Sequence, residues 1–336
     1  MKTSRSGTVD HPPREHRTSA PDAPPRAPKR DLLDLAGMDP AEITALLDAA
    51  ARHAAAATGD DPPPLAGRVV ANLFFEDSTR TRCSFSIAAQ RLGAAVVDLF
   101  EEGSSIRKGE TLADTARSIE AMGVDAIVVR HAASGAAHLL ARAVACGVIN
   151  AGDGRHAHPT QALLDLLALR ERLGAISGRR VAIVGDIGNS RVARSAVHGL
   201  VAMGAEVILI GPPTLVPRSF ESLVDRPGGR PGAVGVAHAL DPELPTLDAI
   251  MMLRVQLERQ AGSAISNDFH QLYGLTAERM RKLPGHAIVM HPGPINRGVE
   301  IDSEAADHPG RSVILRQVAL GVAVRMAVLE WALRDA

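Results

Sequence analysis

The sequence predicts an α/β protein of two domains, each built on a parallel β-sheet flanked by helices. The chain has 336 residues, which is more than a single core usually supports. Short runs rich in β-branched residues alternate with helical segments, which is the pattern of parallel sheets covered on both faces. Polar residues directly follow several of these runs, as in open α/β sheets that bind ligands at the carboxyl ends of their strands.

The composition argues against several classes of partner. The chain is 46% hydrophobic and 22% charged, with a formal net charge of −1, and it contains no long block of one sign. These values favour neither a nucleic-acid nor a membrane partner. No apolar run approaches the length of a membrane span, and the N-terminus lacks the apolar region of a secretory signal. The two cysteines, Cys83 and Cys146, have no paired spacing, so we expect a reducing, cytoplasmic environment.

The first elements in order are a tail and a helix. Residues 1–30 are rich in Pro, Arg, Ser and His and contain almost no large apolar side chains, so we expect a disordered tail. A solvated extension and a contact arm in an oligomer both remain open as its role. The pair Asp39-Pro40, with Glu42, marks the start of the first helix.

Eight apolar runs are expected to form the strands of the two sheets. They are residues 68–75, 95–100, 125–130, 147–150, 179–186, 205–212, 248–254 and 286–292. Helices are expected between many of them, at residues 111–123, 135–147, 160–174 and 190–204. Residues 225–245 are rich in Gly and Pro and are expected to form loops. A long apolar helix over residues 311–333 ends the chain.

Five consecutive residues, Ser78 to Arg82, carry three hydroxyls and two guanidiniums. They lie where the expected strand at 68–75 gives way to a helix, whose apolar face begins at Phe85. The first amides of a helix are unpaired and its dipole is positive there, so an anion such as phosphate fits. Simple N-capping by Ser78, with arginines in local salt bridges, is the alternative. Cys83 is expected to be a packing residue.

A second motif, HAHPTQALLDLL, places His158 just before Pro159 at an expected helix start, with Gln161 three residues on. The imidazole and the amide can therefore face one pocket. A structural hydrogen bond is the usual alternative for a lone histidine. His156 and His158 also raise the question of a metal, but no carboxylate or thiol cluster completes a site in the sequence, so we expect none.

Further cations stand in loops and at strand ends. Lys108 lies in a polar segment between Gly103 and Gly109 that reads as a mobile loop, and it is a solvated charge unless that loop reaches an anion. Arg191, Arg254 and Arg259 follow expected strands, where guanidiniums suit carboxylates. Ordinary surface arginines are the alternative. The stretch GDIGNS departs from G-x-G-x-x-G, so the dinucleotide fingerprint is missing.

Taken together, five motifs resemble the aspartate members of the aspartate/ornithine carbamoyltransferase family. They are STRTR at 78–82, KGETLADT at 108–115, HPTQALLDL at 158–166, MMLRVQLER at 251–259 and HPGPINRGVEI at 291–301. The resemblance runs from about residue 31 to the C-terminus. Ornithine members typically carry HCLP and SMG motifs, whereas this chain has HPGP at 291–294 and Arg254-Val255-Gln256.

The resemblance implies two domains joined by interdomain helices. Residues 31–157 and 308–336 would form the carbamoyl-phosphate-binding domain. Residues 158–307 would form the aspartate-binding domain, with 158–174 as an interdomain helix. The implied assembly is a homotrimer with shared active sites, into which Lys108 and Ser104 or Ser105 enter from a neighbouring subunit. Whether regulatory or dihydroorotase-like subunits join this trimer stays open.

The resemblance also implies the site residues. Carbamoyl phosphate would be bound by Ser78, Thr79, Arg80, Thr81, Arg130, His158 and Gln161. L-Aspartate would be bound by Lys108, Arg191, Arg254, Gln256, Pro292 and Gly293. The catalytic residues among these would be Arg80, Thr81, Lys108, Arg130 and His158. Glu76 would bridge to Arg191 and Arg259 and hold the domains closed.

The implied reaction transfers the carbamoyl group to the aspartate amine, in pyrimidine biosynthesis, without a cofactor, metal or covalent intermediate. Nearby arginines should keep His158 neutral, so we expect it to donate a hydrogen bond rather than act as an acid. Ser86 stands where many relatives have Glu, and Gly293 stands where some relatives have Leu. A silent anion-binding homologue is the alternative function, but it should have lost at least one of the expected substrate-binding cations, and none is lost.

Overall fold

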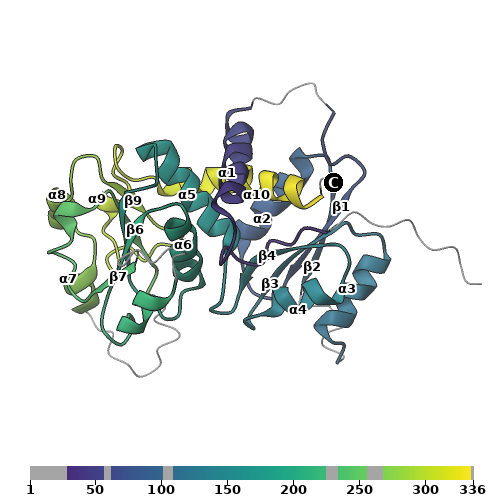
Figure 1. The fold of residues 1–336 in the computed structure, drawn as a ribbon, viewed down its shortest axis with the longest axis horizontal. Coiled ribbons are helices and arrows are strands. Elements are labelled where there is room, and N and C mark those ends of the chain that lie inside the picture. Colours follow the sequence, from purple (N-terminus) through teal and green to yellow (C-terminus); the bar gives the residue numbers. More distant parts are fainter. Residues whose placement is uncertain (1–28, 57–61, 101–108, 225–233, 256–267, 334–336) are drawn as a thin grey trace, which may run out of the picture.

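Two separate parallel sheets with helices on their faces organise the protein (Figure 1). The computed structural model describes residues 29–56, 62–100, 109–224, 234–255 and 268–333. The predicted fold class, α/β with two domains, is confirmed. The expected tail lies outside the described residues except for its end, where the Lys29 amine donates a 3.0 Å hydrogen bond to the Val144 carbonyl.

The first sheet has the strand order β2-β1-β3-β4, with every neighbouring pair parallel. Its strands are β1 (Val69–Phe74), β2 (Ala95–Phe100), β3 (Ala126–His131) and β4 (Gly147–Asp153). Helices α3 (Leu112–Ala121) and α4 (Ala136–Ala143) pack on one face and α2 (Thr79–Arg91) on the other. Because both faces are covered, five consecutive residues of β1 are buried, and every residue of this strand except Asn72 is apolar.

The second sheet has the order β7-β6-β5-β8-β9, again all parallel. Its strands are β5 (Arg180–Val184), β6 (Glu206–Ile210), β7 (Val234–Ala237), β8 (Ala249–Met252) and β9 (Ile288–Met290). Within residues 225–245, which were expected to be rich in loops, residues 234–237 form the strand β7. This edge strand has only four residues, too few to show a strand period against the surrounding Gly and Pro.

The helices around the second sheet are α6 (Arg191–Ala202), α7 (Asp268–Tyr273), α8 (Ala277–Lys282) and α9 (Ser303–Ala306). Two short 3-10 helices, Arg218–Ser222 and Leu244–Thr246, complete it. None of the helices in the described ranges is both long and apolar enough to cross a membrane.

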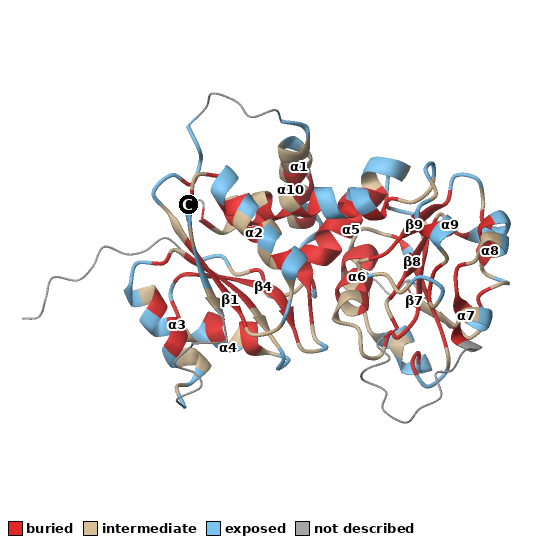
Figure 2. Ribbon diagram, turned by 180° about the vertical axis from the view of Figure 1, so that it is seen from behind, coloured by how far each residue is buried: buried red, intermediate tan, exposed pale blue. Residues whose placement is uncertain are grey.

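Three helices lie between the two sheets or pack against a helix that lies there (Figure 1). They are α1 (Pro40–Ala55), α5 (Pro159–Leu173) and α10 (Ile314–Leu333). Helix α1 begins as expected, because the side chain of Asp39 caps it by accepting from the Ala41 amide at 2.8 Å. Helix α10 packs against α1, α2 and α5, so the end of the chain returns to the first half. Every residue from Pro159 to Leu169 in α5 is buried, as Figure 2 shows along this helix.

Candidate active site

A cleft of about 870 Å³ receives residues from the carboxyl ends of strands in both sheets. This is the arrangement expected for open α/β sheets. Most of the predicted substrate-binding residues line it: Ser78, Thr79, Arg80, Thr81, Arg130, His158, Gln161, Arg191, Arg254, Pro292 and Gly293. Glu76 lines it too. The predicted site residues Lys108, Gln256 and Arg259 lie outside the described residues.

The start of α2 forms one wall of this cleft. Ser78 occupies the N-cap position, but its hydroxyl makes no capping hydrogen bond, so the capping alternative does not account for this residue. Thr79 and Arg80 are exposed at the helix start, while Thr81 is buried at 8% exposure. Free amides, hydroxyls and a guanidinium therefore share the positive end of the helix, which suits a phosphate.

Glu76 joins cations from the two halves of the chain. Its Oε2 lies 2.8 Å from Nη1 of Arg191, at the start of α6, and 3.6 Å from Nε of Arg130, at the end of β3. Arg191 also donates to the Gly154 carbonyl at 3.1 Å, and Arg130 donates to the Ala151 carbonyl at 3.3 Å. The expected contact between Glu76 and Arg191 is thus present, and it spans the two sheets.

Gly152 lets the backbone approach these two guanidiniums. Its φ is +118°, in the region that favours glycine. A Cβ at this position would lie 3.1 Å from Nε of Arg191 and 3.2 Å from Nη1 of Arg130. The glycine therefore leaves room for both arginines beside the turn that leads to His158.

His158 stands at the N-cap of α5 and is only 3% exposed. Its backbone amide donates to the Ser195 hydroxyl at 2.8 Å, which ties the start of α5 to α6. Burial lowers the pKa of its imidazole well below the usual value, and the nearby Arg130, Arg325 and Arg191 lower it further. The side chain is therefore a neutral hydrogen-bonding group near pH 7, in agreement with the sequence-based expectation.

A buried chain of hydrogen bonds leads from Gln161 across the molecule. The Gln161 amide nitrogen donates to Oδ1 of Asp165 at 2.9 Å, and the amide nitrogen of Gln317 in α10 donates to the same oxygen at 2.7 Å. The side-chain oxygen of Gln317 accepts from the His291 backbone amide at 3.0 Å. One N–H of the Gln161 amide is donated to Asp165, and in this orientation its carbonyl oxygen can accept a hydrogen bond from a ligand.

His291 continues this chain into the segment after β9. The Gly293 amide donates to its Nδ1 at 2.7 Å, so the ring proton is on Nε2, which lies 3.2 Å from Oε1 of Glu300. Both side chains of the His291–Glu300 pair are fully buried. The pair therefore holds Pro292 and Gly293 in place at the rim of the cleft.

Asp165, Gln317 and Arg325 were not predicted as site residues. Burial raises the pKa of Asp165 to about 7, against the lowering effect of its hydrogen bonds. Burial also lowers the pKa of Arg325 to about 10, and the guanidinium lies 5.1 Å from the centre of the Phe85 ring. The sequence carries one sign of such residues, which is a polar side chain within a largely apolar stretch of helix. A charged side chain is rarely buried there without a partner.

One further expectation can be compared with the structure. The expectation that Cys83 is a packing residue is wrong, because this residue is exposed and lines the cleft. Cys146 is buried, and burial raises its pKa to about 12.

Ser86, one of the departures from many relatives, accepts a 3.1 Å hydrogen bond from the buried amide of Asn72 in β1. It therefore fastens α2 to its own sheet.

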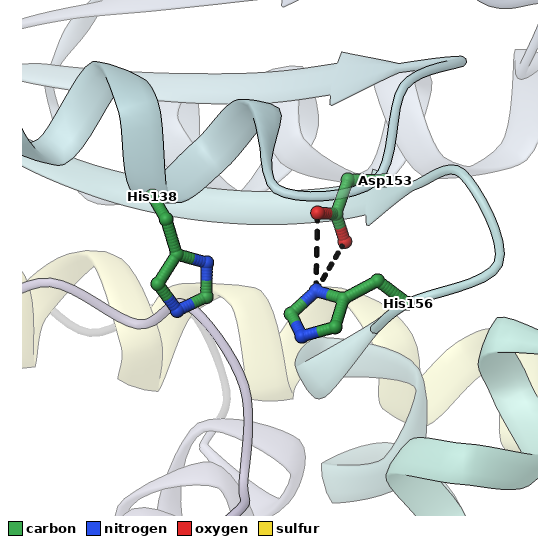
Figure 3. A group of neighbouring side chains, drawn as sticks. All are labelled: His138, Asp153 and His156. Atoms are coloured by element: carbon green, nitrogen blue, oxygen red, sulfur yellow. Dashed lines mark hydrogen bonds and ion pairs between the residues drawn. The ribbon is translucent and has the colours of Figure 1, made fainter.

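The expectation that no carboxylate accompanies the histidines of HAHP is wrong for His156. Asp153, at the end of β4, places both carboxylate oxygens 3.1 Å from Nδ1 of His156, and His138 of α4 lies beside them (Figure 3). The two imidazole rings are 5.3 Å apart. His158 is not part of this cluster, which lies on the other side of the turn.

The sequence falls into two matched parts that agree with the two sheets. Residues 30–171 match the aspartate/ornithine carbamoyltransferase, carbamoyl-P binding domain, and residues 177–332 match the aspartate/ornithine carbamoyltransferase, Asp/Orn binding domain. The chain belongs to the aspartate/ornithine carbamoyltransferase family. The resemblance found in the sequence is thereby confirmed.

Relatives within this family are close in sequence. The aspartate carbamoyltransferase catalytic subunit of Myxococcus xanthus (strain DK1622) is 54% identical over 303 residues, which are 90% of this chain and 98% of that protein. The corresponding subunit of Acidothermus cellulolyticus (strain ATCC 43068 / DSM 8971 / 11B) is 53% identical over 306 residues, which are 89% of this chain and 91% of that protein.

Solved structures of carbamoyltransferases share the fold. Aspartate transcarbamoylase from Trypanosoma cruzi in complex with N-(phosphonacetyl)-L-aspartic acid has a TM-score of 0.79 at 32% identity, covering 90% of this chain and 95% of that one. Ornithine carbamoyltransferase from Pyrococcus furiosus has a TM-score of 0.81 at 28% identity, covering 92% of this chain and 98% of that one. The backbone alone therefore does not separate the aspartate from the ornithine enzymes of the family, whereas sequence identity favours the former.

Proposed function

We propose that this chain is the catalytic subunit of an aspartate carbamoyltransferase, which forms N-carbamoyl-L-aspartate and phosphate from carbamoyl phosphate and L-aspartate. The single observation that carries the proposal is the cleft itself. Its cations come from both halves of the chain, Arg80 and Arg130 from the first and Arg191 and Arg254 from the second. Two polyanionic substrates bound side by side need this distribution of positive charge.

Carbamoyl phosphate would bind at the start of α2. In our proposal its phosphate accepts hydrogen bonds from the amides and hydroxyls of Ser78 to Thr81 and from the guanidinium of Arg80. Thr81, Arg130 and His158 would surround the carbonyl oxygen, and the carbonyl oxygen of Gln161 would accept from the carbamoyl NH₂ group. The hydrogen bond from Gln161 to Asp165 supports this orientation of the amide.

L-Aspartate would bind against the second sheet. Arg191 and Arg254 would hold its two carboxylates, with Gln256 and the backbone at Pro292 and Gly293 assisting. A T. cruzi aspartate transcarbamoylase has been solved with carbamoyl phosphate and aspartate bound, and it is 31% identical to this chain. That relationship supports a site between the two halves.

The reaction follows from the positions of these groups. The neutral amine of aspartate attacks the carbonyl carbon, negative charge develops on the carbonyl oxygen, and phosphate departs with the amine proton. Fixed donors at the developing oxyanion contribute roughly 10²- to 10³-fold each. Holding both substrates in contact removes much of the entropic part of the barrier. Glu76, bridging Arg191 and Arg130, would keep the two halves together while this occurs.

The proposed catalytic unit is a homotrimer in the cytoplasm, with Lys108 reaching the cleft of the neighbouring subunit. Light scattering on the purified chain should report a trimer or a multiple of it. Co-refolding Lys108→Ala chains with Arg254→Ala chains should raise the activity at low L-aspartate above that of either variant alone, because some clefts then combine two intact contributions. A monomer of full activity, or no restoration, would exclude shared sites.

The function is tested by offering two amino acids. Purified protein is mixed with carbamoyl phosphate and either L-aspartate or L-ornithine, and the ureido product is measured. We expect product from aspartate alone. An Arg80→Ala preparation made in parallel detects any host enzyme that co-purifies. Product from ornithine, or none from either amino acid, would refute the proposal and favour an ornithine enzyme or a silent homologue respectively.

A further inference from the structure

Outside the cleft, three segments bring two imidazoles and two carboxylates together. His138 comes from α4, His156 and Asp153 from the end of β4 and the turn that follows, and Asp34 from the segment before α1. Figure 3 shows the two imidazoles side by side, with Asp153 above His156 and joined to its ring by dashed lines. Both histidine side chains are a little over one third exposed, at 38% and 37%, so the space is open to solvent.

Asp153 orients His156 and has no capacity left for another role. Besides the imidazole, its oxygens accept from the Gly135 amide at 2.6 Å, the Asn150 side chain at 2.8 Å and the Ala157 amide at 3.1 Å. A carboxylate at Nδ1 holds the ring proton there and leaves the lone pair on Nε2. Metal-binding histidines are held in this way by a carboxylate that does not itself contact the metal.

The carboxylate of Asp34 lies near the Nε2 atoms of both imidazole rings. Its Oδ2 is 3.8 Å from Nε2 of His156 and 3.7 Å from Nε2 of His138. Its other oxygen accepts from the Ala36 amide at 2.6 Å, which fixes the carboxylate. The distances are too long for hydrogen bonds. They are close to the spacing of about 3.3 Å that separates neighbouring ligands around a tetrahedral Zn²⁺ with bonds of about 2 Å.

Other histidine–carboxylate pairs in the described residues are closer. Nε2 of His286 lies 3.0 Å from Asp248, and Nε2 of His53 lies 3.0 Å from Glu330. Each of these pairs is a direct hydrogen bond. The two contacts of Asp34 are longer than these hydrogen bonds, at 3.7 and 3.8 Å, and leave room for an ion between the ligands.

We propose that Asp34, His138 and His156 form a binding site for a divalent first-row metal ion, with Zn²⁺ as the expected ion and Asp153 as the residue that orients His156. Two imidazoles and a carboxylate are a donor set that Zn²⁺ accepts, and water completes its coordination.

A bound ion would act on the turn that carries His158. The same turn contributes the Gly154 carbonyl that accepts from Arg191. An ion would fasten this turn to α4 and to the segment around Asp34, which pairs with β4 through Leu32. It would stabilise the folded state, because a ligand that binds only the folded chain shifts the unfolding equilibrium.

The test is equilibrium dialysis of the full-length, chelator-treated protein against Zn²⁺, with bound metal measured by mass spectrometry. The double variant His138→Asn/His156→Asn removes two ligands while keeping side chains of similar polarity. His286→Asn is the matched control, because it removes a half-exposed histidine that pairs with one carboxylate only. Asp153 is left intact, since its hydrogen bonds hold the turn.

We expect the native protein and the control to bind Zn²⁺ at one strong site, and the double variant to bind it at least roughly tenfold more weakly. Co²⁺ in place of Zn²⁺ should give the intense visible absorption of a tetrahedral complex in the native protein only. Circular dichroism checks that the double variant is folded. Equal binding by the native protein and a folded double variant, or no strong binding by the native protein, would overturn the proposal. An unfolded double variant is replaced by Asp34→Asn, for which the same outcomes apply.

Discussion

The side-chain amide of Gln317 donates a 2.7 Å hydrogen bond to Oδ1 of Asp165 and so joins α10 to α5 between the two sheets. Asp165 also receives the amide of Gln161, while its other oxygen, Oδ2, is buried without a hydrogen bond. The Asp165 carboxylate thus holds Gln161 of the proposed carbamoyl phosphate site. Through Gln317 it also holds the backbone of His291, which lies beside the proposed aspartate site.

The first prediction concerns stability and pH. The pKa of Asp165 is raised by burial from 3.8 to about 7, so between these values the folded chain holds a proton that the unfolded chain has released. The free energy of unfolding should therefore fall as pH rises from about 4 to 7, by on the order of 4 kcal/mol at most. Asp165→Asn should remove this dependence, so its stability relative to the native protein should increase with pH and level off above about 7.

Urea unfolding at several pH values measures this difference. Asp307→Asn serves as a control of opposite sign, because hydrogen bonds from Arg297 lower the pKa of Asp307. Asp307→Asn should lower the free energy of unfolding slightly at neutral pH and leave it unchanged in acid. If the free energies of unfolding of Asp165→Asn and the native protein differed by the same amount at every pH, the carboxyl of Asp165 would not titrate as a buried group.

The second prediction is that His158 does not titrate in the working range. Burial and three nearby arginines lower its pKa well below 6.5, so the imidazole is neutral at neutral pH. His158→Ala should reduce kcat by roughly 10²- to 10³-fold, as the loss of an oxyanion donor does. The shape of the kcat profile against pH should be the same in both proteins. An acidic limb with a pKa near 6.5 that disappears in the variant would show that the histidine acts as an acid or base.

The third prediction separates the two substrates. Arg254 follows β8 on the side of the cleft built by the second sheet. Arg254→Ala should raise the KM for L-aspartate by roughly 10- to 100-fold, since a hydrogen-bonded charge contributes about 1.5–3 kcal/mol, and should leave carbamoyl phosphate binding nearly unchanged. Arg218→Ala, which removes an arginine whose side chain is 74% exposed, is the control. If Arg254→Ala weakened the binding of both substrates equally, Arg254 would not be specific to the L-aspartate site.

The fourth prediction uses a pair of glycines. Gly293 has a φ of +68°, and a Cβ there would lie 3.2 Å from Cζ of Arg80. Gly298 has a φ of +76°, but a Cβ there would meet nothing within 4 Å. Both changes to Ala should destabilise the protein by about 1 kcal/mol through backbone strain. Only Gly293→Ala should also raise the KM for carbamoyl phosphate, because it displaces Arg80, and steady-state kinetics on both variants tests this.

The fifth prediction concerns thiol chemistry. Cys83 is exposed in the cleft, whereas burial raises the pKa of Cys146 to about 12 and so keeps that thiol protonated. Iodoacetamide should label Cys83 first in the folded protein, and the adduct should reduce activity by crowding the cleft. Saturating carbamoyl phosphate should slow the labelling. Peptide mass spectrometry identifies the site, and a Cys83→Ser protein that loses activity at the native rate would contradict the assignment.

Much of the cleft was predictable because its residues follow strands. Arg130 and Arg254 end apolar runs and Arg191 follows one, and the carboxyl ends of parallel strands converge at one edge of each sheet. Asp165 and Gln317 were missed because each is a buried polar residue in the interior of a helix. A single polar residue there gives no local sign of its partner.

The sequence by itself determined the fold class and the family, because alternating strands and helices and short motifs are properties of neighbouring residues. Only the tertiary structure decided which distant side chains meet. Asp165 and Gln317 are 152 positions apart, and Asp34 approaches His138 and His156 from a third segment. Such pairs arise from how the sheets and helices pack, since the packing sets distances of a few ångströms that no local pattern of the chain encodes.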